Sequence, residues 1–300
     1  MAISVDTERE LAQELDTSYQ RRLVNAALNT YERVYKGSRV SRRQLTAIVR
    51  AATCGSAGVS NVGTALLVEL AKRHAAARNL LPDANIDAWH NWIRADVPDP
   101  AQRRAAHRAL NVFRRLRKKK TVSASDVAPI VHAASSKFVA VWDIGTSCLN
   151  ALAKKHAGAR DAMRAMVSSP DANVRFQLVS SLESELPKTL SKEILRKALA
   201  DKSQRVRRAA IRVADRLRLK ALLPDLQEQL GTERDSATRS DLEWAIAMLR
   251  DGYLLKHDKK GRPELIVRTR GGWTSPPITK KDIARGRLDS IIADAKAGRV

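Results

Sequence analysis

The chain has 300 residues, with 55 lysines and arginines against 32 aspartates and glutamates, and a net charge of +23. Its 44% hydrophobic content can fill a large core, and its 4% aromatic content favours helix-on-helix packing over a β-rich fold. Two cysteines exclude a disulfide framework, and no apolar run approaches the roughly 20 residues that span a bilayer. The amino terminus lacks a signal sequence. We therefore expect a cytoplasmic protein without cofactor, metal or membrane partner.

The positive charge is clustered. The segments with the largest basic excess are 21–50, 101–120, 201–220 and 253–300. Clustering of this kind is typical of a protein that binds a polyanion. A generally basic, solvated surface is the alternative.

The first 97 residues predict four helices. Two of them open with capping boxes, Thr7-x-x-Glu10 and Ser41-x-x-Gln44. The predicted ranges are 7–37, 41–55, 61–79 and 85–95, with a break at Leu81-Pro82-Asp83.

A second region, residues 98–252, begins at Pro98-Asp99-Pro100, where one helix must stop and another can start. Prolines and glycines separate the helices that follow. The predicted helices lie at 100–118, from 125 onward, and at 136–155, 161–168, 172–186, 191–200, 203–219, 221–230 and 236–250.

A third region, residues 253–300, begins without the helical periodicity of the preceding segments. Two short β-branched or apolar runs around Asp258-Lys-Lys-Gly-Arg-Pro predict a hairpin. Thr279-x-x-Asp282 then caps a last helix that runs to about Ala297. We expect this region to cover the end of a helical stack.

A short pattern recurs every 32 residues, at Val174-Arg175, Val206-Arg207 and Thr238-Arg239. Such a period predicts an all-α, right-handed α–α superhelix. Asp171-Ala-Asn-Val-Arg175 resembles the HEAT repeat, clearly over 170–250 and in a more diverged form over 99–116. That resemblance implies that Arg175, Arg207 and Arg239 form a ladder with aspartates between neighbouring repeats.

Other arginines of these helices lie on faces away from the predicted apolar stripes. Arg205, Arg208, Arg212 and Arg216 form one ridge, and Arg104, Arg108 and Arg115 form another. Like charges at these spacings repel one another in an isolated helix. We predict that both ridges contact phosphates. The alternative is that they are solvated faces whose aliphatic stems cover apolar surface.

Trp142-Asp143-Ile-Gly-Thr146, upstream of Arg175, resembles the bacterial alkylpurine DNA glycosylases built from HEAT-like repeats. The resemblance implies that Trp142 and Asp143 lie beside a damaged nucleotide and that Arg175 contacts the DNA backbone. The family's catalytic aspartate falls at Thr146, which cannot supply a carboxylate to stabilise a developing sugar cation.

We therefore predict a non-catalytic scaffold that binds nucleic acid through phosphate contacts, with DNA favoured over RNA and the choice between them left open. Two alternatives remain open. One is a diverged glycosylase of the alkylation-repair type, and the other is an adaptor for an acidic protein.

Overall fold

The computed structural model describes residues 15, 17–37, 40–258, 260–269 and 272–299. The chain divides into two compact units, residues 1–159 (unit 1) and residues 160–300 (unit 2). The predicted capping box at Thr7 and Glu10 lies outside the described residues. The predicted boundaries at 97 and 252 stay predictions.

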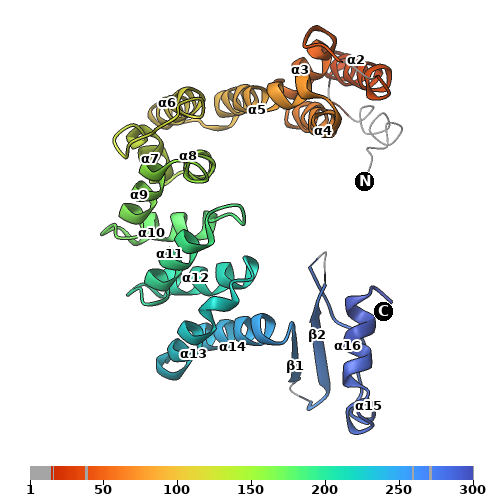
Figure 1. The fold of residues 1–300 in the computed structure, drawn as a ribbon, viewed down its shortest axis with the longest axis vertical. Helices are drawn as coiled ribbons and strands as arrows, with labels where there is room; N and C mark the ends of the chain where they lie inside the picture. The colour runs from red at the N-terminus through yellow and green to blue at the C-terminus, as the bar shows by residue number, and fades with distance from the viewer. Residues whose placement is uncertain (1–14, 16, 38–39, 259, 270–271, 300) are drawn as a thin grey trace. The chain divides into compact units, whose positions relative to one another are not determined.

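Unit 1 is helical throughout its described residues (Figure 1). Its elements are α2 (Ser18–Tyr35), the short 3-10 helix η1 (Arg43–Leu45), α3 (Thr46–Ala52), α4 (Ala57–Arg73), α5 (Ala75–Asp96), α6 (Pro100–Leu116), α7 (Ala128–Ala134) and α8 (Val139–Ala153). Helix α9 (Ala157–Met166) follows and crosses the boundary between the units.

The helix starts in unit 1 follow local sequence. A capping box at Thr17 and Gln20 opens α2, and the predicted box at Ser41 is confirmed, since its hydroxyl accepts from the Gln44 backbone N–H. The side chain of Asp99 caps α6.

The predicted break at Leu81-Pro82-Asp83 is wrong, and the predicted helix 7–37 is not continuous, since residues 15 and 17 lie outside α2. Helix α5 runs through Pro82, and the chain turns instead at His74, whose backbone is extended. Proline removes one helical hydrogen bond, but burial of Leu80, Ile86 and Ile93 on the same helix offsets that cost.

Unit 1 contains a duplication that the 32-residue echo does not reveal. Residues 18–78 align without a gap to residues 100–160, an offset of 82 residues. The helix bounds repeat as well, because α2, α3 and α4 begin 82 residues before α6, α7 and α8. Identical pairs include Gln20 and Gln102, Leu28 and Leu110, Ile48 and Ile130, Gly63 and Gly145, Thr64 and Thr146, and His74 and His156.

A glycine holds two helices close together in each copy. A side chain on Gly63 would collide with the backbone of Ala51 and Ala52, and one on Gly145 would collide with that of Ala133 and Ala134. Only glycine permits so close an approach of two backbones. This packing of α4 on α3 and of α8 on α7 explains why the glycine is identical in both copies.

Unit 2 continues with paired helices and ends in a sheet. Its helices are α10 (Ala172–Ser181), α11 (Lys188–Leu199), α12 (Gln204–Arg216), the 3-10 helix η2 (Lys220–Leu222), α13 (Leu223–Thr232) and α14 (Ser236–Arg250). The predicted helix positions over 172–250 are confirmed, with α10 and α12 ending earlier than expected.

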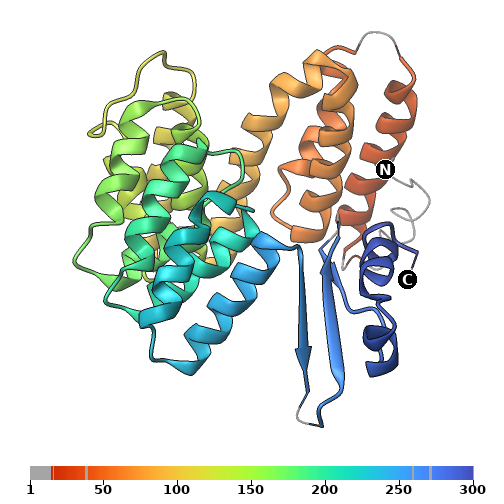
Figure 2. The ribbon, with the colours of Figure 1, turned by 60° about the horizontal axis from the view of Figure 1, so that its bottom comes forward.

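The predicted hairpin is present and gains a third strand. Strands β1 (Tyr253–His257), β2 (Pro263–Arg268) and β3 (Trp273–Thr274) form an antiparallel sheet in the order β1-β2-β3. The predicted last helix is in fact two, α15 (Lys280–Ala284) and α16 (Leu288–Lys296), because the chain turns at Gly286 with φ 71°. Helix α16 packs on β2 (Figure 2).

The repeat arginines of unit 2 are structural, as the sequence predicts, but their partners differ from the prediction. Arg175 forms an almost fully buried ion pair with Asp201, at 2.6 Å. One repeat later, Arg207 pairs with Glu233 at 2.9 Å. Both carboxylates come from the loop before the next repeat helix, whereas Asp171 caps the amino terminus of α10.

Arg239 completes the series without a carboxylate, since its guanidinium donates to the backbone carbonyls of Leu230 and Glu233. Asp235 caps α14. Two features therefore recur in the 32-residue pattern. One is a residue that caps the repeat helix, and the other is an arginine that bonds this helix to the loops beside it. The structure confirms the predicted fold class, a mostly helical repeat protein with a small C-terminal sheet and helices.

The ladder predicts a large stability effect. Arg175→Met keeps a long apolar stem but leaves Asp201 buried without its partner, which costs about 3–5 kcal/mol in comparable sites. Urea denaturation followed by circular dichroism would measure the loss. Arg250→Met, which removes an exposed ion pair with Asp251, is the control and should cost far less, because exposed ion pairs contribute little to stability. Equal losses in the two variants would contradict the structural role.

Candidate functional site

The arginine ridge predicted on α12 is partly occupied by contacts within unit 2. Arg208 and Arg212 share the carboxylate of Asp241, at 2.7 and 3.2 Å. Arg216 donates to the backbone carbonyls of Ser180 and Leu182, each at 2.9 Å. These contacts stabilise repeat packing and leave less of this charge for a ligand.

Arg205, the remaining member of that ridge, stacks on the ring of Phe176 at 3.8 Å and donates to Asn173. A cation held over an aromatic face is already partly compensated.

The ridge on α6 is different. Arg104, Arg108 and Arg115 are exposed, and no carboxylate pairs with them among the described residues. The arginines that turn toward α5 are compensated, because Arg114 pairs with Asp87 and Arg117 pairs with Asp83. The acids of α5 therefore neutralise the inner side of α6 and leave its outer ridge positive.

Beside this ridge lies a groove made of three adjoining pockets, which we call the basic groove. The first, about 400 Å³, is lined by Arg104, His107, Arg108, Asn111, Val112 and Arg115. The second, about 590 Å³, shares His107 and Asn111 with the first and adds Thr53, Asp87, His90, Asn91, Arg94 and Arg114. The third, about 670 Å³, shares Thr53, Asn91 and Arg94 and adds Tyr19, Leu23, Arg50, Cys54, Gly55 and Ala95.

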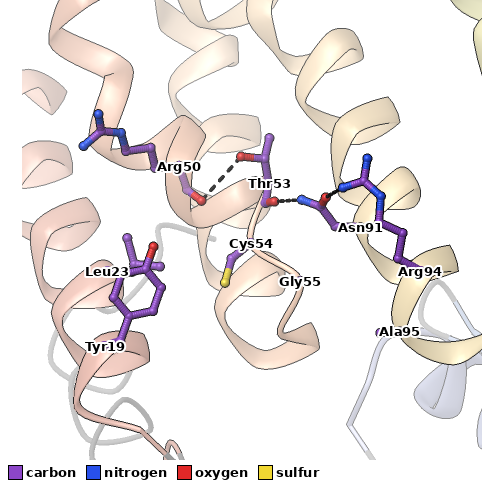
Figure 3. A pocket seen from close by; sticks show the side chains of 9 residues that line it. All are labelled: Tyr19, Leu23, Arg50, Thr53, Cys54, Gly55, Asn91, Arg94 and Ala95. Atoms are coloured by element: carbon purple, nitrogen blue, oxygen red, sulfur yellow. Dashed lines mark hydrogen bonds between the residues drawn. The ribbon is translucent and has the colours of Figure 1, made fainter.

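The third pocket is lined by residues of α2, α3 and α5, and a hydrogen bond joins α5 to the end of α3. Figure 3 shows Asn91 between the backbone carbonyl of Thr53, to which its amide donates, and Arg94, which donates to its carbonyl oxygen at 3.0 Å. Arg50 comes from α3, and Tyr19, with 60% of its surface exposed, comes from α2. The cations along this groove suit a ligand that carries phosphate groups.

Two histidines meet in the middle of the groove. The Nδ1 atoms of His90 and His107 lie 2.7 Å apart, so one ring donates to the other. Burial lowers the pKa of both, and the facing charges act in the same direction: His107 and Arg114 lower the pKa of His90, and Arg94 and Arg103 lower that of His107. Asp87 opposes this for His90. Both rings are therefore neutral at pH 7.

The sequence predicted one side of this groove and missed the other. Arg104, Arg108 and Arg115 are visible as a ridge in the sequence. Arg50 is the one basic residue of α3, and Arg94 is 16 residues away from Arg78, the other arginine of α5. Only the packing of α3 and α6 against α5 brings them to one surface.

Trp142 and Asp143 lie on α8 and are not among the residues that line the basic groove. Asp143 lines another pocket, with Trp89 and Trp92, in which no lysine or arginine is found among the described lining residues. Burial raises the pKa of Asp143. A carboxylate without a nearby cation repels a phosphate, so this pocket does not suit a DNA backbone.

Thr146, at the place of the glycosylase aspartate, is a scaffold residue. It is buried, and its hydroxyl donates to the backbone carbonyl of Asp143 at 3.1 Å. The first copy carries the same Gly-Thr pair at Gly63-Thr64. Arg175, the predicted backbone contact, is 5% exposed and held by Asp201, so it belongs to the ladder.

Comparison with known proteins places part of the chain in a repeat class. Residues 161–247 match the family model for HEAT repeats, so this part of the chain consists of HEAT-like repeats. A search of curated proteins found no match. No similarity to DNA glycosylases emerged from these comparisons.

Solved structures with similar folds include an archaeal HEAT-like repeats protein from Thermococcus onnurineus NA1, at 14% identity and a TM-score of 0.36. That alignment covers 83% of this chain and 98% of the archaeal one. A designed armadillo repeat protein aligns at 12% identity and a TM-score of 0.24, over 81% of this chain and 99% of the other. At these scores the likeness does not extend to function.

The described residues hold neither a cluster of three metal-ligating side chains nor a helix long and apolar enough to cross a membrane.

The histidine pair predicts a pH dependence of stability. Because the pKa of each ring is lower in the folded chain, the unfolded chain binds more protons below about pH 6.5. The free energy of unfolding should therefore fall as the pH drops below 6.5. His107→Asn, which introduces the residue found at the equivalent Asn25, should flatten that dependence between pH 6.5 and 5 in urea titrations. An unchanged slope would contradict it.

Proposed function

We propose that the chain is a non-catalytic scaffold that binds nucleic acid, duplex DNA in particular, along the basic groove of unit 1. One observation carries the proposal: the exposed arginines of α6 lack acidic partners among the described residues, while most arginines of unit 2 have them. Uncompensated like charges on one ridge lower stability, and binding a polyanion would relieve their repulsion.

The neighbouring groove supports the same ligand. Arg50 and Arg94 extend the positive surface beyond α6. Backbone phosphates need cations along a line rather than an enclosed site, and the open groove offers such a line. We assign Arg104, Arg108 and Arg115 to phosphate contact and leave Arg175, Arg208 and Arg212 to the scaffold.

An acidic protein is the second candidate, because HEAT repeats serve as surfaces for protein partners and the match to HEAT repeats covers residues 161–247. Clustered arginines would attract an acidic polypeptide by the same long-range field.

The proposal predicts steeply salt-dependent binding of a 20-base-pair duplex by the full chain. Each phosphate contact contributes about 0.9 to the slope of log affinity against log salt. Arg104→Gln, Arg108→Gln and Arg115→Gln together should make the slope shallower by roughly 2 to 3 and weaken binding at least about tenfold. Fluorescence anisotropy at several salt concentrations measures both.

A matched control removes the same charge elsewhere. Arg196, Arg250 and Arg262 are exposed arginines of unit 2 that already pair with carboxylates. Their triple glutamine variant should keep the wild-type slope. Equal losses in both variants would reduce the effect to net charge and contradict a site on α6. Tighter binding of poly-glutamate than of the duplex, at matched charge and salt, would favour the acidic-protein candidate.

A further inference from the structure

The first copy of the duplication carries its own polar strip, on α2. Arg22, Asn29, Arg33 and Lys36 stand at the places of Arg104, Asn111, Arg115 and Lys118. All eight residues are exposed. The pattern Arg-x6-Asn-x3-Arg-x2-Lys therefore occurs twice in the chain.

The spacing of the pattern places its members on one face of a helix. Steps of seven, four and three residues each return to nearly the same side at 3.6 residues per turn. The two helices are also turned alike, because Ala27 and Leu28 are buried on α2 just as Ala109 and Leu110 are on α6. The two strips therefore occupy equivalent outer faces of their copies.

Packing does not account for the repetition of these residues. Buried positions keep the same residue in both copies because close packing restricts the size and shape of the side chain. Exposed positions are under no such restriction. Neighbouring exposed or partly exposed positions on the same helices have diverged, as at Asn25 and His107, Ala26 and Arg108, and Glu32 and Arg114. The strip has kept its residue types where its surroundings have changed.

The charges of the α2 strip are also uncompensated. No carboxylate pairs with Arg22 or Arg33 among the described residues, as with Arg104 and Arg115 on α6. Lys118 of the α6 strip approaches Asp83 at 4.0 Å. From Arg22 to Arg33 the helix rises about 16 Å, enough to follow several phosphates.

We propose that α2 carries a second phosphate-binding strip, Arg22, Asn29, Arg33 and Lys36, equivalent to the strip on α6. It rests on the proposed function of the basic groove and extends it, since the chain then holds a nucleic acid backbone at two equivalent places.

The test compares four full-length proteins by anisotropy against a 40-base-pair duplex at several salt concentrations: wild type, R22Q/R33Q, R104Q/R115Q and the quadruple variant. Each double variant should lower the slope of log affinity against log salt by about 1.8, and the quadruple variant by about twice that. R250Q/R262Q is the control for net charge and should match the wild type.

The outcomes separate the two claims. If R104Q/R115Q weakens binding and R22Q/R33Q does not, the α2 strip is refuted and the α6 site stands. If neither double variant differs from R250Q/R262Q, the proposed function itself fails. R22K/R33K, which keeps the charge, should restore most of the salt slope, and thermal melting should show that R22Q/R33Q remains folded. If R22K/R33K binds as weakly as R22Q/R33Q, a phosphate role for α2 is excluded.

Discussion

The close packing of glycine backbones constrains unit 1 more than any other contact. Gly63 and Gly145 each let one helix rest directly on the backbone of the preceding one. That contact sets how the second and third helices of each copy pack together, and the first helix of the copy packs on both of them. The arginines of α2 and α6 form exposed strips because the opposite side of each helix is buried in the core of its copy.

The arginines of this chain fall into two groups, those that pair with a carboxylate and those that do not. In unit 2, Arg175 and Arg207 reach carboxylates that are almost completely buried, where removal of either partner is costly. In unit 1, the acids Asp83 and Asp87 of α5 neutralise the inner arginines of α6 and no others of that helix. A net charge of +23 is therefore an incomplete guide, and we propose that the arginines without a carboxylate partner form the ligand-binding surface.

The sequence predicted the repeat class well and the site only in part. The echo at Arg175, Arg207 and Arg239 predicts HEAT-like packing because caps and ladder arginines are local devices with fixed spacing. The acidic partners of Arg208 and Arg212 could not be foreseen, since Asp241 meets them only when α12 packs on α14. Pro82 led to the wrong prediction of a helix break, because tertiary packing of α5 overrides the tendency of proline to end a helix. The duplication is visible in the sequence at Gly63-Thr64 and Gly145-Thr146, and it makes α2 the counterpart of α6.

The central claim is that free arginines on α2 and α6 bind the ligand while paired arginines hold the fold together. Arginine-specific chemical modification of the full chain, with and without duplex DNA, followed by mass spectrometry of peptides, tests it most directly. DNA should protect Arg22, Arg33, Arg104, Arg108 and Arg115. Arg175 and Arg207 should react slowly in both states, because their guanidinium groups are already buried in ion pairs. Protection confined to the arginines of α12, with those of α2 and α6 unchanged, would contradict the account.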